Sequence, residues 1–371
     1  MKIPFAIFLT LFILFSSKQA LAFPELVRHG YVNCTACHLS PAGGGLLNPY
    51  GRELSKELLS TWARDGEQNF AYGAINPPEK LLLGAYVRAL QLYEDSPSAT
   101  VAKAILMQAD VEAAYNAEKW AIDGTVGRRL YYDSSGNEQH SLYSRRHYVL
   151  GRVSEKQTLR FGRFQNEYGI NDPNHELFVR DSLGFGNDTE SYGLEYSYGG
   201  ENWTFFLTGL LGNFHDKYST NQEHGASATA SYFFLDKDKV GLSYLYGESY
   251  QYKRNTFGPW GIISLTDKLY VESETDYQVK ISKIAPSTQS GYVTEQKLAY
   301  DIRQGITPYG VWEYARLNLD DPKSQKQSFG AGIHLYPRPH IELTAEWQKL
   351  KIFSSGDYYA DYAWIMANFY L

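Results

Sequence analysis

Two cysteines and a histidine form the group of residues with the clearest chemical meaning. They stand together as Cys34-Thr-Ala-Cys37-His38, in the spacing C-x-x-C-H. In this spacing two thiols can add across the vinyl groups of a c-type haem, and the imidazole that follows can bind the iron. We therefore predict that Cys34 and Cys37 attach one covalent haem c and that His38 is its proximal iron ligand.

The C-x-x-C-H spacing also leaves three alternatives to haem open. A C-x-x-C pair can be a redox-active disulfide, but that setting includes a βαβ unit and none is predicted to follow. The pair can be half of a zinc site, although the chain has only 2 cysteines and no histidine cluster beside them. It can also be a chance match. Against chance, this one motif uses both cysteines of the chain.

The motif does not specify the second axial ligand of such a haem. His29 is the first candidate, because it precedes Cys34 on the same short segment. A pair of histidines would give a lower reduction potential than a histidine with a methionine. Met107 is another candidate, since Met107 and Met366 are the only methionines after residue 22, and both fall in predicted strands. The alternatives are a different histidine, an open position on the iron, or an exposed His29 with no such role.

Residues 1–22 have the layout of a secretory signal peptide. Lys2 supplies a positive charge, an apolar stretch covers 3–15, and Ala20-Leu-Ala22 is a small-x-small cleavage pattern. Lys18 interrupts the apolar stretch, which argues against a retained membrane anchor. We expect the protein to leave the cytoplasm, which agrees with a haem that is attached outside it.

Residues 23–78 are predicted to be a small segment that wraps the haem. Ser40-Pro-Ala-Gly-Gly-Gly45 is predicted to be a loop in which glycine lets the backbone approach the ring closely. Asn48-Pro49 has the pattern of a helix start, followed by an apolar stripe that covers haem or simply packs. The stripe consists of Leu54, Leu58, Leu59 and Trp62. About 50 residues build little core of their own, so haem or a surrounding wall must supply the packing.

Residues 79–371 are predicted to form a β-barrel. The strands are long, alternate apolar with polar or small residues, and are rich in aromatic side chains, with 31 Tyr in the chain. At 157–164, for example, Leu159 and Phe161 occupy alternate positions. These features are typical of an outer-membrane antiparallel barrel. A soluble solenoid or sandwich fits less well, because no internal repeat is visible and the strands are long.

About 16 strands are predicted, at 80–94, 101–115, 118–132, 141–153, 156–168, 189–198, 202–212, 224–235, 239–248, 255–264, 267–283, 291–303, 306–318, 325–337, 339–351 and 358–371. Tight turns near 116, 154, 200, 237, 266, 304 and 338 alternate with longer connections near 96, 136, 178, 217, 251, 287, 322 and 355. Outer-membrane barrels have short periplasmic turns and long outer loops. Both barrel ends and the haem segment are therefore expected on the periplasmic side.

Net charge and hydropathy exclude two classes of protein. The net charge of −6 argues against a nucleic acid as partner, because nucleic-acid binding needs a basic surface. Past the N-terminus no run of ~18 apolar residues occurs, so transmembrane helices are not expected.

Several residues inside the predicted barrel are candidates for a role in the lumen. The longest connection, 171–188, contains His175, Glu176, Arg180 and Asp181, and it either folds into the lumen or stays on the surface. A group of arginines can attract anions, hold haem propionates or line a wet lumen as in any porin. They are Arg128, Arg129, Arg145, Arg146, Arg152, Arg160, Arg163 and Arg180. His215 and His224 form a weak candidate for a metal site.

The layout resembles the fused monohaem cytochrome–porins of bacterial outer membranes, of which the best-known members are iron oxidases. The resemblance covers the whole chain as an architecture, and its motif is carried by Cys34, Cys37 and His38. It implies an outer-membrane protein whose haem receives electrons from extracellular Fe(II). It also implies an Fe(II):cytochrome c oxidoreductase activity. The run Gly43-Gly-Gly45 is not a feature that we can match to that family.

The function predicted from the sequence is electron transfer across the outer membrane. A barrel of about 16 strands encloses a water-wide lumen, and a haem segment that plugs it from the periplasm would hold one redox centre within the membrane. Its partners would be outer-membrane lipid, an extracellular donor or acceptor such as Fe(II), and a periplasmic c-type cytochrome. The alternative is a porin for small anions with an accessory haem segment. A third alternative is a haem segment that hangs in the periplasm as a docking module.

Overall fold

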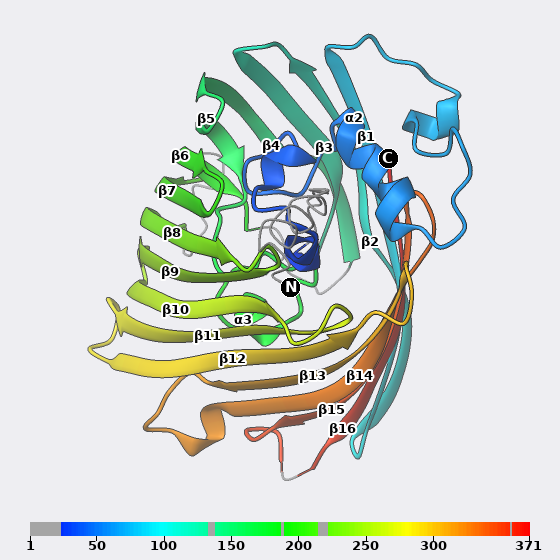
Figure 1. The fold of residues 1–371 in the computed structure, drawn as a ribbon. Coiled ribbons are helices and arrows are strands. Elements are labelled where there is room, and N and C mark those ends of the chain that lie inside the picture. The colour runs from blue at the N-terminus through cyan, green and yellow to red at the C-terminus, as the bar shows by residue number, and fades with distance from the viewer. Residues whose placement is uncertain (1–23, 133–137, 187–188, 214–221, 357) are drawn as a thin grey trace, which may run out of the picture.

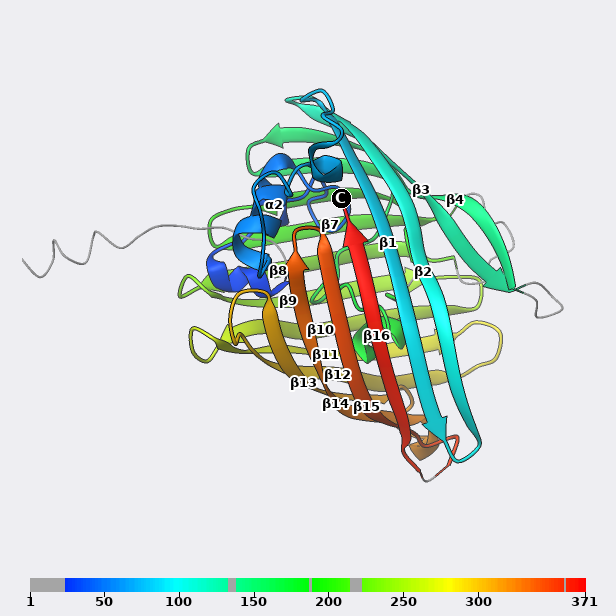
Figure 2. The same ribbon diagram turned by 90° about the vertical axis from the view of Figure 1, so that its right-hand side faces the viewer.

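The protein is a closed antiparallel β-barrel with a short N-terminal segment inside it (Figures 1 and 2). The computed structural model describes residues 24–132, 138–186, 189–213, 222–356 and 358–371. The predicted signal peptide, 1–22, lies outside the described residues. The strands are β1 Leu81–Ser96, β2 Ala99–Asn116, β3 Trp120–Tyr132, β4 Glu138–Ser154, β5 Gln157–Phe164, β6 Ser191–Gly199, β7 Trp203–Gly212, β8 His224–Phe234, β9 Asp238–Glu248, β10 Tyr252–Ser264, β11 Leu269–Ser282, β12 Thr288–Tyr300, β13 Ile306–Arg316, β14 Gln325–Arg338, β15 Ile341–Ile352 and β16 Ala360–Tyr370.

Each strand pairs with its neighbours in sequence, and β1 closes the ring on β16. Tyr86 lies opposite Tyr370 and Asp95 opposite Asp361 in this last pair. Closure removes the free edges that an open sheet would expose, so the backbone polar groups of the wall are satisfied strand to strand. The strand count of sixteen confirms the prediction. The largest error in a strand end is at β5, which stops at Phe164 rather than 168.

Side chains alternate between the outer surface and the lumen along each strand. In β5, Leu159 and Phe161 are exposed on the outside, while Arg160 between them is 2% exposed and points into the lumen. Val111 in β2 and Leu242 in β9 repeat the exposed apolar pattern. An apolar outer belt with a polar interior suits a wall that faces hydrocarbon on one side.

Aromatic rings gather on the outside near the short-turn end of the strands. Tyr115 and Trp120 flank the β2–β3 turn with ring centroids 5.5 Å apart. Trp203 at the start of β7 lies 4.7 Å from Tyr232 on β8. Such rings form the girdles that mark the interfaces of outer-membrane barrels.

The predicted alternation of short and long connections holds only in part. The β1–β2 connection is 97–98, a tight turn in which Ser96 pairs with Ala99, and the β9–β10 connection is 249–251. The prediction that both are long is wrong. Long strands explain the first error, because β1 and β2 carry the chain out as a hairpin without a loop. The two ends of the barrel still lie on one side, since consecutive antiparallel strands alternate direction whatever the loop length. That this side is the periplasmic one stays a prediction.

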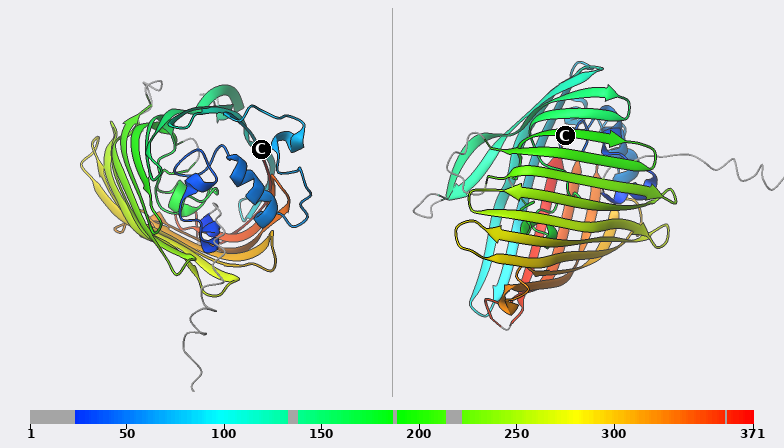
Figure 3. Two further views of the ribbon diagram at one scale, coloured as in Figure 1. Left: turned by 45° about the horizontal axis from the view of Figure 1, so that its top comes forward. Right: turned by 90° about the vertical axis from the view of Figure 1, so that its left-hand side faces the viewer.

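The segment before β1 begins inside the ring of strands, and its last part, around residues 70–73, lies outside the ring beside β16 (Figure 3, left). It contains five short helices: η1 Pro24–His29, η2 Cys34–Ala36, α2 Pro49–Leu54, η3 Ser55–Leu59 and η4 Phe70–Gly73. The helix start is as predicted, because the Asn48 side chain accepts a hydrogen bond from Gly51 N and Pro49 follows it. The helix ends earlier than the apolar stripe suggested, and Trp62 beyond it is 57% exposed.

Polar contacts attach this segment to the short-turn end of the barrel. Arg28 pairs with Asp301 at 2.6 Å in the β12–β13 connection. Thr61 N donates to Tyr336 O at 2.8 Å, and Asn33 Nδ2 donates to Gly200 O at 3.0 Å. The segment therefore closes that end of the lumen from within, as expected of a plug.

The β5–β6 connection also folds into the lumen, with the short helix α3 Phe178–Asp181 (Figure 1). The barrel wall holds its backbone: Ile170 N donates to Glu274 at 2.6 Å, and Phe178 N donates to Glu313 at 2.5 Å. Of the two alternatives for this connection, the lumen is correct. In the described part of the chain no helix is long and apolar enough to cross a membrane.

Candidate cofactor site inside the barrel

The C-x-x-C-H motif forms a tight turn inside the lumen. Cys37 N and His38 N both donate to Cys34 O, at 3.1 and 2.9 Å, so the three side chains leave one compact turn. Cys37 is buried in a cluster with Leu26, Tyr31, Leu47 and Leu59. The cluster fixes one thiol, while Cys34 is half-buried.

A cavity of about 340 Å³ lies against this turn. Cys34, Cys37 and His38 all line it, together with residues from the barrel wall and from the β5–β6 connection. Its volume falls in the range of roughly 300–1,000 Å³ typical of ligand and cofactor sites. Apolar lining comes from Leu26, Val27, Leu47, Leu54, Leu59 and Ile262.

Glycines leave the space that the motif needs. A Cβ on Gly43 would lie 3.3 Å from Cys34 Sγ, and one on Gly51 would lie 2.5 Å from Cys37 O. Gly43, Gly44 and Gly45 all have positive φ, the region that glycine adopts without strain. A Cβ on Gly45 would also lie 2.9 Å from the Arg146 guanidinium. The glycine run thus lets the loop pass between the motif and the barrel wall.

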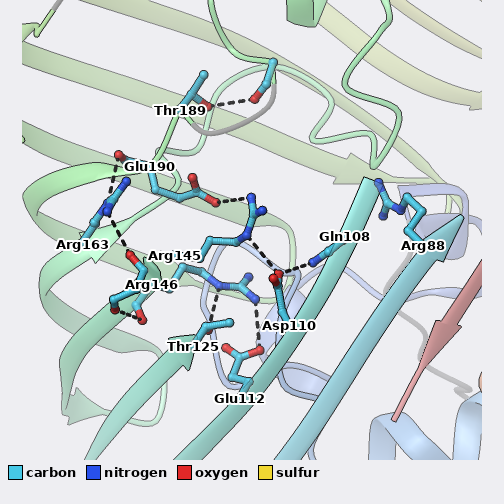
Figure 4. A network of polar contacts seen from close by, with 12 residues as sticks. Arg88, Gln108, Asp110, Glu112, Thr125, Arg145, Arg146, Arg163, Thr189 and Glu190 are labelled. Carbon is cyan, nitrogen blue, oxygen red and sulfur yellow. Dashed lines mark hydrogen bonds and ion pairs between the residues drawn. The ribbon is translucent and has the colours of Figure 1, made fainter. Parts of the chain in front are cut away.

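Most arginines beside the cavity are paired with carboxylates of the wall (Figure 4). Arg145 on β4 contacts Asp110 at 3.0 Å and Glu190 at 3.4 Å. Arg146 contacts Glu112 at 3.0 Å. Their charges are therefore largely compensated within the protein.

Arg160 on β5 is paired in the same way and also reaches the segment. Its Nη2 lies 2.7 Å from Glu195, and its Nη1 donates to Ser40 Oγ at 2.8 Å. The guanidinium thereby links the barrel wall to the loop that follows the motif.

Two arginines that line the cavity form no ion pair with a carboxylate among the described residues. Arg88 on β1 donates only to Pro173 O, at 3.3 Å, and its buried Nε has no acceptor. Arg180 on α3 is 2% exposed, donates to Tyr168 O and Asn171 Oδ1, and also has a buried Nε without an acceptor. Arg88 is half-buried and Arg180 is buried, and carboxylates lie near both beyond ion-pair distance, Glu342 and Asp172 around Arg88 and Glu274 and Asp276 around Arg180. The N–H groups that bind no carboxylate can still receive an anion.

These observations fit a haem at the site. Haem carries two propionates, and the cavity offers two guanidinium groups that form no ion pair with a carboxylate among the described residues. It also offers the two thiols and the imidazole on one turn. No other described feature of the lumen combines these groups.

One further cation and one carboxylate flank Cys34. Lys239 at the start of β9 donates to Val32 O at 3.0 Å, and both Lys239 and Glu167 line the cavity. Burial raises the pKa of the Cys34 thiol to about 11, and the nearby Glu167 carboxylate adds to the rise. Burial also raises the pKa of Glu167, to about 7.

The candidate second ligands are placed differently from the motif. His29 is exposed at the end of η1, and it does not line the cavity. Met107 on β2 and Met366 on β16 do not line it either. His175 from the β5–β6 connection does.

The predicted arginine group divides by position. Arg145, Arg146, Arg160 and Arg180 line the cavity. Arg163 lines a second cavity, and Arg152 binds Asn116 at the short-turn end. Arg128 lies on β3, and the side chain of Arg129 is outside the described residues.

Six charged residues that line the cavity were not among those predicted from the sequence: Arg88, Glu167, Asp172, Glu190, Lys239 and Glu342. Arg88 had a signal, because it falls on the inward positions of β1 with Leu82, Gly84 and Tyr86. Nothing in the sequence indicated a role for Glu167, because 156–168 was predicted to be a strand.

A second cavity, of about 980 Å³, lies toward the long-loop end. We call it the vestibule. Gly212, Tyr252 and Lys280 line it near the long-loop ends of their strands. Gln165 and Phe185 line both cavities, so the β5–β6 connection forms a shared wall between them. Phe185 stacks on Tyr168 with ring centroids 4.3 Å apart.

The suggested histidine metal site gains no support from the described residues. His224 is exposed at the start of β8, and His215 lies outside them. No group of three or more His, Cys, Asp or Glu side chains that could hold a metal ion occurs in the described ranges.

Comparison with known proteins shows the class of fold. No protein-family model and no curated protein matches the sequence. Among solved structures, a loop-deletion form of OmpT from the outer membrane of Vibrio cholerae is similar, with a TM-score of 0.60 and 14% identity over 78% of this chain and 99% of that one. OmpF of Salmonella typhi in complex with daunomycin has a TM-score of 0.55 and 14% identity over 79% and 98% of the chains.

An anion-selective porin from Comamonas acidovorans is also similar, with a TM-score of 0.58 and 8% identity over 78% and 99% of the chains. At these identities the likeness shows the fold alone. The chain has the closed 16-strand barrel fold of outer-membrane porins.

Proposed function

We propose that the protein transfers electrons across the bacterial outer membrane through one c-type haem bound covalently inside its barrel. The observation that carries the proposal is that Cys34, Cys37 and His38 line one cavity together with Arg88 and Arg180, two arginines that form no ion pair with a carboxylate among the described residues. The barrel fold supports the membrane location, and its exposed apolar belt suits a lipid surround.

Each residue of the site would bind a different part of the cofactor. Cys34 and Cys37 would form the thioethers, and His38 would be the proximal ligand. Arg88 and Arg180 would receive the two propionates. When bound, the haem supplies a one-electron couple at its iron.

The environment of Cys34 disfavours its thiolate form. A thiol whose pKa is raised to about 11 is protonated at neutral pH and is a poor nucleophile. Short turns mark the periplasmic end of such barrels, so the segment would enter the lumen from the periplasm.

The arrangement supports a conduit with two distinct ends. The vestibule would receive the extracellular donor or acceptor, such as Fe(II), which gives up one electron and becomes Fe(III). Phe185 and Gln165 separate the vestibule from the cofactor cavity. An electron would cross this boundary without any solute passing through it. A periplasmic c-type cytochrome would exchange that electron at the plugged end.

The test is a visible spectrum of the purified, detergent-solubilised protein before and after addition of Fe(II) at neutral pH. A c-type spectrum that is reduced promptly supports the conduit and its iron donor. A c-type spectrum reduced only by dithionite keeps the electron-transfer function and excludes Fe(II). Absence of covalent haem overturns the proposal.

A porin for small anions is the second candidate, and the fold likeness favours it. A loop inside the lumen and cations on the wall are features of a selective pore. The two functions differ in conductance: a plugged conduit gives negligible ion current in a planar bilayer, whereas a porin gives discrete open channels.

A further inference from the structure

A histidine from a second segment reaches the cofactor cavity. The structure describes the side chains of seven histidines: His29, His38, His147, His175, His224, His334 and His340. Of these, only His38 and His175 line the cavity. His38 comes from the N-terminal segment and His175 from the β5–β6 connection, so each of the two segments that enter the lumen contributes one imidazole.

The barrel holds the backbone on both sides of His175. Before it, Asn174 N donates to Asp172 at 2.7 Å, and Asp172 is paired with Lys297 of β12 at 2.9 Å. After it, Phe178 N donates to Glu313 of β13 at 2.5 Å. A residue fixed between two anchors a few positions apart can present its side chain at a defined place, as a metal ligand requires.

Contacts also join this connection to the residues around the motif. Asn171 Nδ2 donates to Ala42 O at 3.2 Å, in the loop that follows His38. Arg88 donates to Pro173 O at 3.3 Å, two residues before His175. The β5–β6 connection, which carries His175, is therefore held against both the N-terminal segment and an arginine of the cavity.

The imidazole has a partner that would orient it. His175 Nε2 lies 3.1 Å from Glu176 Oε1. A histidine that binds a metal commonly donates its other ring N–H to a carboxylate, which fixes the tautomer and makes the ligating nitrogen more basic. Glu176 is in place for that role.

We propose that His175 is the second axial ligand of the haem, opposite His38. This inference rests on the proposed function, because it presupposes that the haem is attached. It replaces His29, Met107 and Met366, none of which lines the cavity. A pair of histidines would also place the reduction potential below that of a His/Met site.

The test compares His175→Ala with His29→Ala in the full-length, detergent-solubilised protein. Covalent attachment is measured first, by haem staining of the denatured band. Axial ligation is measured separately, by optical and electron paramagnetic resonance spectra of the oxidised protein. Heat-modifiable migration on a gel checks that each variant forms the barrel.

The expected result is a low-spin haem in the native protein and in His29→Ala. His175→Ala should keep its covalent haem but lose the low-spin signal completely, and added imidazole should restore it. A low-spin spectrum in His175→Ala overturns the inference, as does a high-spin spectrum in the native protein. Loss of the signal in His29→Ala also overturns it. A native protein without covalent haem overturns the proposed function itself, so the two failures are distinguishable.

Discussion

The wall of the barrel satisfies its own backbone from β1 around to β16, whereas the segment 24–80 depends on that wall for its structure. The wall has long regular strands and an alternating pattern along each. The segment has five helices of three to six residues, and its buried residues pack with wall residues such as Tyr336 and Tyr370. Helices this short are not stable alone in water.

This difference assigns separate roles to the two regions. The wall supplies stability and a shielded interior, and the segment supplies the groups with chemistry. Damage to the segment should therefore remove function without unfolding the barrel. Variants of the segment and of its contacts test whether stability and chemistry are divided in this way. Their expected effects range from complete loss of the cofactor to a small change in its reduction potential.

Replacing both attachment residues should have an all-or-none effect. In Cys34→Ser/Cys37→Ser no thioether can form, so we expect complete loss of covalent haem and of electron transfer, measured by haem staining and by Fe(II)-dependent reduction. The barrel should still show heat-modifiable migration. The matched control is Thr35→Ala, which changes an exposed residue between the two cysteines and should keep the haem. Haem retained in the double variant would contradict the assignment.

Removing the cation that anchors the segment should loosen it from the wall. Arg28 pairs with Asp301 at 2.6 Å, donates to Asp267 O at 2.8 Å and lies 4.0 Å from the centre of the Tyr270 ring. Loss of a buried charged partner costs about 2–5 kcal/mol. Arg28→Ala should therefore raise the rate of native-state proteolysis within 24–80 by roughly a hundredfold or more.

The comparison for Arg28→Ala is Lys56→Ala, which removes pairs to the exposed Asp65 and Glu57. Surface pairs contribute little, so this variant should be cleaved at the native rate. Equal sensitivity of the two variants would show that the segment is not held by its buried contacts with the turns.

The segment should also be released in acid. His340 in the β14–β15 turn is fully buried and donates from Nε2 to Gln68 O at 3.1 Å. Burial lowers its pKa from 6.5 to about 4. The stabilisation is therefore present above pH 6.5 and is lost as the pH falls toward 4, at up to about 1.4 kcal/mol per pH unit.

The free energy needed to expose the segment to a protease should therefore be about 2 kcal/mol lower at pH 5 than at pH 7.5. His340→Gln cannot take up the proton, so its protection should change less between the two pH values. A native protein whose protection is unchanged between pH 7.5 and 5 would rule out His340 as a pH-sensitive contact.

The smallest expected effect is on the reduction potential. Arg88→Gln removes one cation from the cavity, which disfavours the reduced, more electron-rich haem. We expect the potential to fall by roughly 60 mV, equivalent to a tenfold change in the one-electron equilibrium. Arg152→Gln removes an arginine at the short-turn end, away from the cavity, and should leave the potential unchanged in a spectroelectrochemical titration. An equal fall in the reduction potential of both variants would show that Arg88 acts through the overall charge of the protein and not through its place in the cavity.

The barrel could be predicted almost completely from the sequence, because alternation is a local signal. Each strand reports its own outward and inward positions, as Leu159 and Arg160 do, and the ring follows from sixteen such strands joined in order. The motif was equally readable, since its chemistry depends on spacing within five residues. The loop lengths at 97–98 and 249–251 could not be predicted, because polar residues near a strand end resemble a loop.

The set of residues around the cavity could not be predicted in the same way. Arg88 lies on β1, whereas Arg180 and His175 lie in the β5–β6 connection, and their meeting depends on how that connection packs inside the lumen. Nearness to the motif in sequence favours His29 as a ligand, yet its side chain is exposed at the end of η1.

The sequence by itself determined the barrel and the C-x-x-C-H turn, because both arise from patterns that repeat or act over a few residues. Only the tertiary structure decided that the β5–β6 connection lies inside the lumen and which arginines among the described residues there form no ion pair with a carboxylate. Those outcomes depend on contacts such as Ile170 with Glu274 and Phe178 with Glu313, across more than a hundred residues. Such pairings are selected by the closed geometry of the wall, and no local pattern encodes them.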